Sequence, residues 1–413
     1  MKHTGLTTAL LLTVLCLISS AASASTWYAN GVSGSNSNDC KSPTTACKTI
    51  GHAISLASAG DSIMIAAAVY NEHLVISHSL KLIGAGSSST IVDGGGTGRV
   101  VTISSLIAHV SLQKLTIQNG LTSGGTVHAA GIYNLGTLAI ASCLISGNHT
   151  HGTTESRGGG IYNNGTLTIT RSTITGNTTS GLSAGGGIYN GGTLTINTST
   201  INQHTAAIGG GIYSSSALTI NRSTLFANQA IDGGAVYSPG TVAINNSTIS
   251  GNSASIGGGI DNVGVLTVSN STLNANQAVH NCELCGQGGN LYNTSGATVT
   301  LQNSIVANSA SGGNCSGTMI SNGYNLSSDA TCNFKSTGDL NNIDPILGPL
   351  QYNGGPTQTI ALRSGSPAID AGNPNGCTDG LGHLLKTDQR GKPRPDTEDT
   401  AGCDMGAFER QSD

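Results

Sequence analysis

Two short segments of the chain carry side chains that could bind a metal ion. His280, Cys282, Glu283 and Cys285 lie close together, and His149, His151 and Glu155 form a second group. Clustered Cys, His and carboxylate groups are typical zinc or redox ligands. For the first group we favour a disulfide between Cys282 and Cys285 beside a solvated histidine. For the second we favour a solvated polar loop, because no fourth ligand is evident.

A third group of acidic residues lies near the C-terminus and could bind calcium. Its members are Asp370, Asp379, Asp388, Asp396, Asp399 and Asp404. Calcium prefers oxygen ligands, but the spacing of an EF-hand loop is missing. Turns with ion pairs to Arg390 and Arg394 explain the same residues equally well. The sequence therefore predicts no required cofactor, with calcium as the open alternative.

Acid–base catalysis requires carboxylates at a defined separation, and residues 100–310 contain few of them. Besides Glu155 and Glu283 there are Asp232 and Asp261, whose slots in the repeat differ by five strand positions. Five extended residues span about 16 Å, whereas even an inverting glycosidase wants about 6.5–9.5 Å. We therefore expect no catalytic residue in the regular repeats.

The runner-up hypothesis is a polysaccharide lyase or glycoside hydrolase with a site among the less regular residues. Asp93, Arg99 and Glu72 are its candidate groups. Asp93 also suits a turn, because Gly94, Gly95 and Gly96 follow it and Asp and Gly are the usual turn residues.

The elements that position these side chains are built from a repeated sequence motif, which consists of glycine, an aliphatic residue and usually tyrosine. Its aliphatic residues are 29, 27, 24, 24, 24 and 31 positions apart, namely Ile132, Ile161, Ile188, Ile212, Val236, Ile260 and Leu291. Repeats of this length cannot bury their own apolar faces and must stack. Each holds three short alternating strands separated by Gly, Asn and Ser corners. This pattern predicts an all-β protein, a three-faced parallel β-helix in which one chain winds through successive coils.

Equivalent residues of successive coils should stack about 4.8 Å apart, as neighbouring strands do. One column contains Asn148, Asn177, Asn228, Asn252 and Asn276, with His204 among them. Another contains Tyr133, Tyr162, Tyr189, Tyr213, Tyr237 and Tyr292, with Asp261 in place of one tyrosine. We favour a stacked ladder that stabilises the protein, and a surface for glycans or a partner protein is the alternative. The gap at Asp261 should expose the ring faces of Tyr237 and Tyr292, which makes these three residues the candidate ligand site.

The chain divides into four predicted segments. Residues 1–24 resemble a secretory signal peptide, with Lys2 before an apolar run that is too short for a membrane span. Residues 25–60 should cap the solenoid with a short helix, because Ile50, Ala53, Ile54 and Ala57 have helical spacing. Residues 61–345 form the β-helix, with Leu112–Ile117 as one of its strands, and residues 346–413 form a C-terminal module.

The cysteines of the exported chain fall mostly in close pairs. We expect disulfides in these pairs, which are Cys40 with Cys47, Cys282 with Cys285, Cys315 with Cys332, and Cys377 with Cys403. Cys143 is left over and stands where the next coils have serine, so we expect it to be buried and unpaired.

Two sets of motifs resemble known families. The phrases at 158–163 and 246–252, Gly-Gly-Gly-Ile-Tyr-Asn and Asn-Ser-Thr-Ile-Ser-Gly-Asn, resemble repeats of bacterial right-handed parallel β-helix surface proteins. That group is related to pectin lyases and, more distantly, to polymorphic outer-membrane proteins. The segments 344–350, 353–357, 365–372, 388–391 and 403–409 resemble the choice-of-anchor Q domain. That resemblance implies an exported surface protein without an assigned reaction.

The function predicted from these observations is a secreted or cell-surface binding or structural module, and the partners would be glycans or proteins. A net charge of -4 with only 9% charged residues offers no basic patch for nucleic acid. No later segment could cross a membrane, and we expect a monomer. The runner-up remains the carbohydrate-active enzyme.

Overall fold

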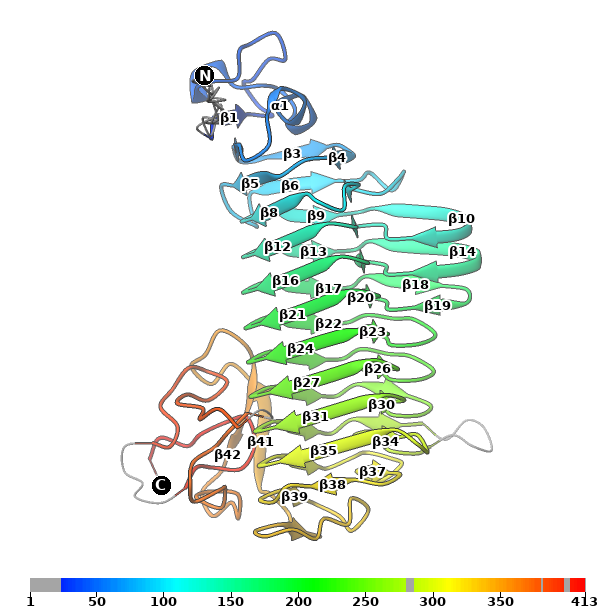
Figure 1. The fold of residues 1–413 in the computed structure, drawn as a ribbon, viewed down its shortest axis with the longest axis vertical. Helices are drawn as coiled ribbons and strands as arrows, with labels where there is room; N and C mark the ends of the chain where they lie inside the picture. The colour runs from blue at the N-terminus through cyan, green and yellow to red at the C-terminus, as the bar shows by residue number, and fades with distance from the viewer. Residues whose placement is uncertain (1–23, 280–285, 380–381, 397–401, 413) are drawn as a thin grey trace, which may run out of the picture.

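The computed structural model describes residues 24–279, 286–379, 382–396 and 402–412. Its main body is a stack of coils with three parallel sheets, A, B and C, running along its length (Figure 1). Each regular coil passes through one strand of sheet C, then one of sheet A, then one of sheet B. The all-β solenoid expected from the repeats is confirmed.

Sheets A and B each contain twelve strands in spatial order. The strands of sheet A are β1 (Thr26–Ala29), β2 (Ser62–Ile65), β5 (Leu80–Gly84), β8 (His109–Gln113), β12 (Thr137–Ala141), β16 (Thr166–Thr170), β21 (Thr193–Asn197), β24 (Ala217–Asn221), β27 (Thr241–Asn245), β31 (Val265–Ser269), β35 (Thr298–Gln302) and β38 (Ile320–Ser321). The strands of sheet B are β3 (Ala68–Asn71), β6 (Thr90–Asp93), β9 (Thr116–Gln118), β13 (Leu144–Ser146), β17 (Thr173–Thr175), β22 (Thr200–Asn202), β25 (Thr224–Phe226), β28 (Thr248–Ser250), β32 (Thr272–Asn274), β36 (Ile305–Ala307), β39 (Leu326–Ser327) and β40 (Leu340–Asn341).

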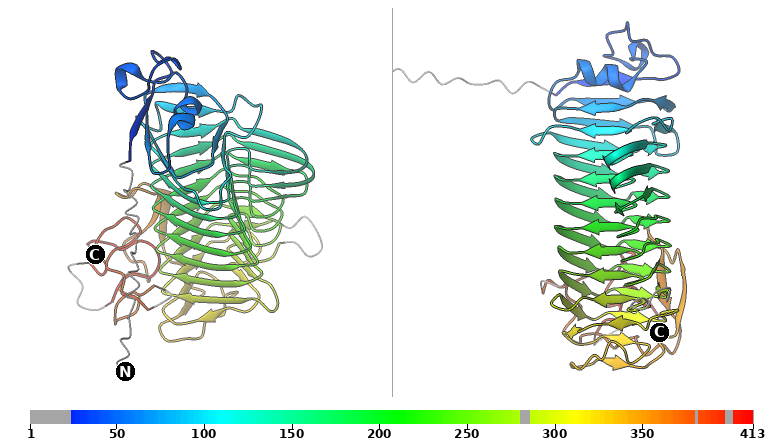
Figure 2. Two further views of the ribbon diagram at one scale, coloured as in Figure 1. Left: turned by 45° about the horizontal axis from the view of Figure 1, so that its top comes forward. Right: turned by 90° about the vertical axis from the view of Figure 1, so that its right-hand side faces the viewer.

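Sheet C has ten strands and carries the tyrosines. The strands of sheet C are β4 (Leu74–Ile76), β7 (Val101–Ile103), β11 (Ile132–Asn134), β15 (Ile161–Asn163), β20 (Ile188–Asn190), β23 (Ile212–Ser214), β26 (Val236–Ser238), β30 (Ile260–Asn262), β34 (Leu291–Asn293) and β37 (Cys315–Ser316). A smaller sheet, which we call the flap, inserts between sheets B and C and projects from the solenoid (Figures 1 and 2). The flap consists of β10 (Leu121–His128), β14 (His149–Arg157), β18 (Thr178–Ser180) and β19 (Ser183–Ala184).

Alternation within each strand builds the core. In β16 the side chains of Leu167 and Ile169 are fully buried, while the three threonines between and beside them face outward. The register then repeats the pattern, because Leu167 pairs with Leu194 and Ile169 with Ile196. Burial of each such side chain stabilises the fold by about 1.5–3 kcal/mol. One apolar core therefore runs along the whole solenoid.

A polar column lines the inside of the corner that follows each strand of sheet B from β13 to β32. Asn252 donates from its side-chain amide to Asn276 Oδ1 at 2.8 Å and accepts from the backbone N–H of Asn228 at 3.0 Å. His204 fills the same slot one coil above Asn228 and accepts from the backbone N–H of Asn177 at 3.1 Å through Nδ1. These bonds satisfy backbone groups that the corners bury. The asparagine column is thus built as its spacing predicted.

One predicted strand is wrong in extent. Residues 112–117 divide into the end of β8 and the start of β9. Lys114, between them, has φ 53° and turns the chain from sheet A to sheet B. The apolar residues on both sides of this corner face the same core, which gave them the appearance of one strand.

Both ends of the solenoid carry additional structure. The 3-10 helix η1 (Pro43–Thr45) and the helix α1 (Ile50–Leu56) lie at the N-terminal end, and α1 buries Ile50, Ala53 and Ile54 as expected. Residues after β40 pack along the side of the later coils (Figure 1) and contain the antiparallel pair β41 (Leu347–Gln351) and β42 (Thr359–Leu362). A last parallel pair, β29 (Ser253–Ala254) and β33 (Gln277–Ala278), continues the side of the flap.

Three of the expected disulfides are present, namely Cys40–Cys47, Cys315–Cys332 and Cys377–Cys403. Cys143 is buried and free, as its slot predicted. Cys282 and Cys285, with His280 and Glu283, lie outside the described residues, as do residues 1–23 of the predicted signal peptide. No helix among the described residues is long and apolar enough to cross a membrane.

Candidate functional site: the tyrosine column of sheet C

The candidate site lies on the outer face of sheet C. Strand register places Tyr133, Tyr162, Tyr189 and Tyr213 directly above one another, followed by Tyr237. The aliphatic residue before each tyrosine points into the core, so each ring points outward. We call these five residues, continued by Asp261 and Tyr292, the tyrosine column.

The rings of the column are stacked. Neighbouring centroids are 5.1, 5.1, 4.9 and 5.6 Å apart, with interplanar angles between 4° and 12°. Tyr162 and Tyr189, inside the stack, are only 8% and 9% exposed. The ladder that we favoured is therefore present, and only ring edges and hydroxyls of its middle members can face a ligand.

Two arginines lie on the stacked rings. The guanidinium of Arg99 is 4.7 Å from the centroid of Tyr133, and that of Arg157 is 4.9 Å from the centroid of Tyr189. Arg99 is fixed by donating to the backbone carbonyls of His128 and Ala129. Arg157 is fixed by an ion pair with Glu155 at 2.5 Å. Both distances fall within the range of cation–π attraction.

Three hollows follow the column from coil to coil. The upper hollow, of about 530 Å³, is lined by Arg99, His128, Tyr133 and residues of β10. The middle hollow, of about 380 Å³, lies between the flap and the rings of Tyr189 and Tyr213, and Glu155, Arg157 and Leu182 also line it. The lower hollow, of about 350 Å³, is lined by Gln287, by Tyr292 with the five residues that follow it, and by Ser316, Gly317 and Thr318. Four tyrosines of the column therefore line a hollow, namely Tyr133, Tyr189, Tyr213 and Tyr292.

Asp261, which we expected to leave a gap in the column, is itself covered. Register does place Asp261 between Tyr237 and Tyr292, but its side chain is only 5% exposed. The reason is the corner before it. Gly257 has φ 60° and turns the chain back so tightly that a Cβ on it would lie 2.7 Å from the Cβ of Asp261. Among the three candidate ligand residues, Tyr237 and Tyr292 are partly exposed and Asp261 is covered.

The large separation that we expected between Asp232 and Asp261 is wrong, because of the same corner. Asp232 forms a bridge with Ile256, the residue before Gly257. The corner therefore brings Asp232 beside Asp261, whereas an extended chain would keep them far apart. Burial, and next the charge of Asp232, raise the pKa of Asp261 to about 7. Burial also raises the pKa of Asp232.

The other candidate residues do not converge. His149 and His151 bond to Thr178 at 2.5 Å and Ser180 at 2.7 Å across the flap, while Glu155 turns to Arg157. Within the described parts of the chain, the metal-like group with suitable spacing is Cys40, Cys47 and His52. Its two sulfurs already form a disulfide, so the group does not fit a metal ion.

The residues of the runner-up enzyme site have structural partners. Glu72 accepts from the backbone N–H groups of Ile50 and Gly51, both at 2.8 Å, at the start of α1. Asp93 accepts from the N–H of Gly95 in the turn that we considered. Arg99 lies against the ring of Tyr133 in the tyrosine column. These three side chains therefore do not form one catalytic group.

The C-terminal acidic residues form ion pairs and hydrogen bonds with their own module. Asp388 pairs with Arg390 at 2.7 Å, and Asp404 accepts from the backbone N–H of Asp370 at 2.9 Å. Arg394 pairs with Glu409 at 2.7 Å, and both side chains are fully buried. Asp399 lies outside the described residues. The ion-pair interpretation holds for Asp388, and the partner of Arg394 is a glutamate rather than an aspartate.

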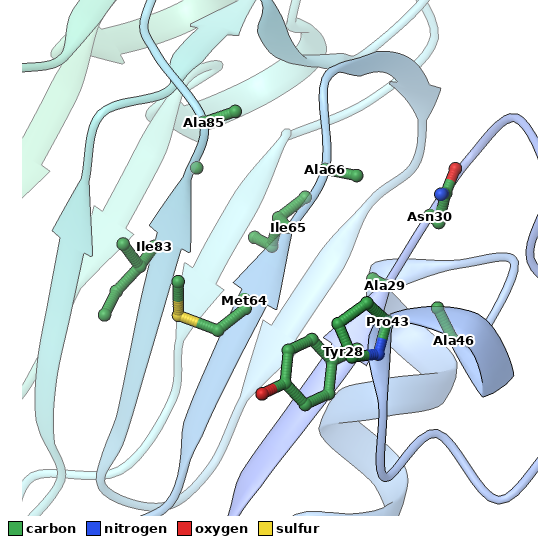
Figure 3. A pocket seen from close by; sticks show the side chains of 11 residues that line it. Tyr28, Ala29, Asn30, Pro43, Ala46, Met64, Ile65, Ala66, Ile83 and Ala85 are labelled. Atoms are coloured by element: carbon green, nitrogen blue, oxygen red, sulfur yellow. The ribbon is translucent and has the colours of Figure 1, made fainter.

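A further hollow lies near the N-terminal end, between β1, β2 and β5. Figure 3 shows Tyr28, Met64 and Ile83 around it, on three neighbouring strands. Its volume is about 220 Å³, and no charged side chain lines it. It lacks the convergent polar groups that a specific binding site needs, so we place the candidate site on sheet C.

One functional residue beside the column, Arg157, was missed in the sequence. Arg157 immediately precedes the glycine run Gly158–Gly160, and this position was the available signal for a cation at the corner. The proximity of Asp232 to Asp261 depends on how sharply the corner folds, which residue spacing does not encode.

No family model matches the chain, and no curated protein is similar to it in sequence. The resemblance of the C-terminal module to choice-of-anchor Q domains therefore stays a prediction. Solved structures that share the fold include a pectate lyase and XylC. The pectate lyase Pel9A has a TM-score of 0.58 at 14% identity, over 93% of this chain and 96% of that chain. XylC, solved with xylose, has a TM-score of 0.52 at 9% identity, over 93% and 98%. The fold is thus a right-handed parallel β-helix of the pectin-lyase-like type.

Proposed function

We propose that the protein is an exported, non-enzymatic glycan-binding rod that holds a polysaccharide chain along the tyrosine column. The observation that carries the proposal is the middle hollow, where the flap faces Tyr189 and Tyr213 and where Arg157 lies 4.9 Å from the ring of Tyr189. A chain of sugar rings could occupy successive hollows on one face. Tyrosine hydroxyls and fixed guanidinium groups can form hydrogen bonds with the hydroxyl and carboxylate groups of sugars.

Two further observations support the proposal. The disulfides suit an oxidising compartment outside the cytosol. The fold is shared with a pectate lyase and with a protein solved with xylose. Binding rather than cleavage is favoured at the middle hollow, because its one lining carboxylate, Glu155, is held by Arg157.

Leu182 provides a direct test. Its side chain is 75% exposed on the flap and lines the middle hollow. We expect Leu182→Asn and Arg157→Gln each to weaken binding to polygalacturonate or xylan by about tenfold, roughly 1.4 kcal/mol, measured by calorimetry. Val265→Asn is the matched control, because Val265 is 47% exposed on sheet A, away from the column.

Two results would contradict the proposal. One is the absence of binding to any member of a broad glycan array. The other is an equal loss of affinity in the Val265→Asn control. An assay for reducing ends and unsaturated products, with and without calcium, separates this function from the lyase or hydrolase alternative.

A further inference from the structure

The lower part of the tyrosine column differs chemically from the upper part. Tyr213 covers one face of Tyr237 at 5.6 Å, but the next level of the column holds Asp261 and the one after it Tyr292. Tyr237 and Tyr292 are thus two strand spacings apart, about 9.6 Å. A carboxylate is shorter than a phenol ring, so beyond Asp261 no ring covers the facing sides of these tyrosines. A cation placed midway would lie about 4.8 Å from each ring, within the range of cation–π attraction.

Two carboxylates accompany these rings. Asp261 lies between them in the strand, and the corner at Gly257 brings Asp232 alongside. Both carboxylates act on Tyr237, because burial and then the charges of Asp261 and Asp232 raise the pKa of its hydroxyl. The level between the two rings is therefore acidic as well as aromatic.

The carboxylates have no cationic partner among the residues that the structure describes. The ion pairs in that part of the chain involve other residues. Asp261 is 5% exposed, and its Oδ1 accepts no hydrogen bond. An unsatisfied polar atom inside a protein is rare and calls for an explanation. A cation held against the other oxygen of this carboxylate would offset the charge that burial leaves unpaired.

We propose that Asp232 and Asp261, between the rings of Tyr237 and Tyr292, form a subsite for a protonated amine of a bound glycan, such as an amino-sugar unit. This inference rests on the proposed function, because the amine would be delivered by the chain lying along the column. An ammonium group offers three donors for the carboxylates and a charge for the rings. A calcium ion wants six to eight oxygen ligands, and aromatic faces supply none. The lower hollow at Tyr292 would hold the next sugar.

The acetylated and free forms of one oligosaccharide provide the test. At about pH 7, where the carboxyl of Asp261 is about half ionised before a ligand binds and ionises further beside a bound ammonium, we expect a glucosamine hexamer to bind about tenfold more tightly than the N-acetylglucosamine hexamer, as measured by calorimetry. Asp261→Asn and Asp232→Asn should each abolish this preference. Asp344→Asn is the control, because Asp344 is exposed beyond the last coil. Thermal melting of each variant verifies that it is folded.

Several outcomes would overturn the subsite. Equal affinity for the two hexamers, or a preference that survives Asp261→Asn, would contradict it directly. Tighter binding of a lysine-rich peptide would reassign the acidic level to a protein partner, and cleavage of the hexamer would reassign the pair to acid–base catalysis. If polygalacturonate or xylan still binds through Arg157 and Leu182 while the amine preference is absent, only the subsite fails. If no glycan binds at all, the proposed function fails with it.

Discussion

The regular coils and the C-terminal module bury polar groups in two different ways. In the coils a buried side chain bonds to its own counterpart one coil away, as Asn163 does to Asn190 at 2.8 Å. In the module each buried group has a partner of its own, as Arg394 has Glu409. The module also contacts the solenoid through single bonds between distant residues, for example Gln389 to Thr248 at 2.6 Å. The coils therefore distribute their polar contacts over many copies, whereas the module concentrates them in a few.

The largest effect should follow from breaking the buried pair of the module. Arg394→Met leaves Glu409 buried without its cation and removes the bond from Arg394 to Asn246 Oδ1 at 2.7 Å. We expect a loss of about 3–5 kcal/mol, which should appear as faster hydrogen exchange of the module while the coils stay protected. Chemical denaturation would give the magnitude.

The exposed Arg363 supplies the control, since Arg363→Met removes a charge from the same module at its surface. The double variant Arg394→Met/Glu409→Leu should recover most of the stability, because it leaves no buried charge. Unchanged exchange in the module of Arg394→Met would show that its docking does not depend on this pair.

An intermediate effect is expected at the one irregular member of the asparagine column. Burial lowers the pKa of His204 to about 4, below its ordinary value of 6.5, so the folded protein holds the neutral ring. The unfolded chain takes up a proton as the pH falls below about 6.5, whereas the folded chain does so only near 4. Stability is thus complete above 6.5 and declines below it by about 1.4 kcal/mol per pH unit, roughly 3 kcal/mol in total.

His204→Asn restores the residue type of the column and should remove that part of the acid sensitivity. Denaturation midpoints of both proteins at several pH values between about 4 and 7 would measure the difference. His109→Asn changes an exposed histidine of sheet A and should leave the pH profile as it is. Parallel profiles for the original protein and His204→Asn would show that the buried ring does not titrate as described.

The same contrast explains which features the sequence could predict. The residues of a column such as Asn148 to Asn276 recur at the spacing of one coil, so their stacking and burial could be predicted from the sequence. Cys143 was placed correctly for the same reason, by comparison with the serines of later coils. The approach of Asp232 to Asp261 could not be predicted, because it depends on the backbone angles of the glycine corner. The partners of Arg394 and Gln389 could not either, because each contact occurs once between residues far apart in the chain.

The smallest of these effects tests the regular coils with two adjacent asparagines. Asn163 is fully buried, donates to Asn190 Oδ1 and to the backbone carbonyl of Thr193, and accepts from Asn134. Asn164, the next residue, is exposed. We expect Asn163→Ala to cost about 1–3 kcal/mol, because its neighbours lose partners inside the protein. Asn164→Ala should stay within about 0.5 kcal/mol of the original protein. If denaturation gives the two variants equal stability, the hydrogen bonds between stacked asparagines are a consequence of the close stacking of the coils and do not stabilise it.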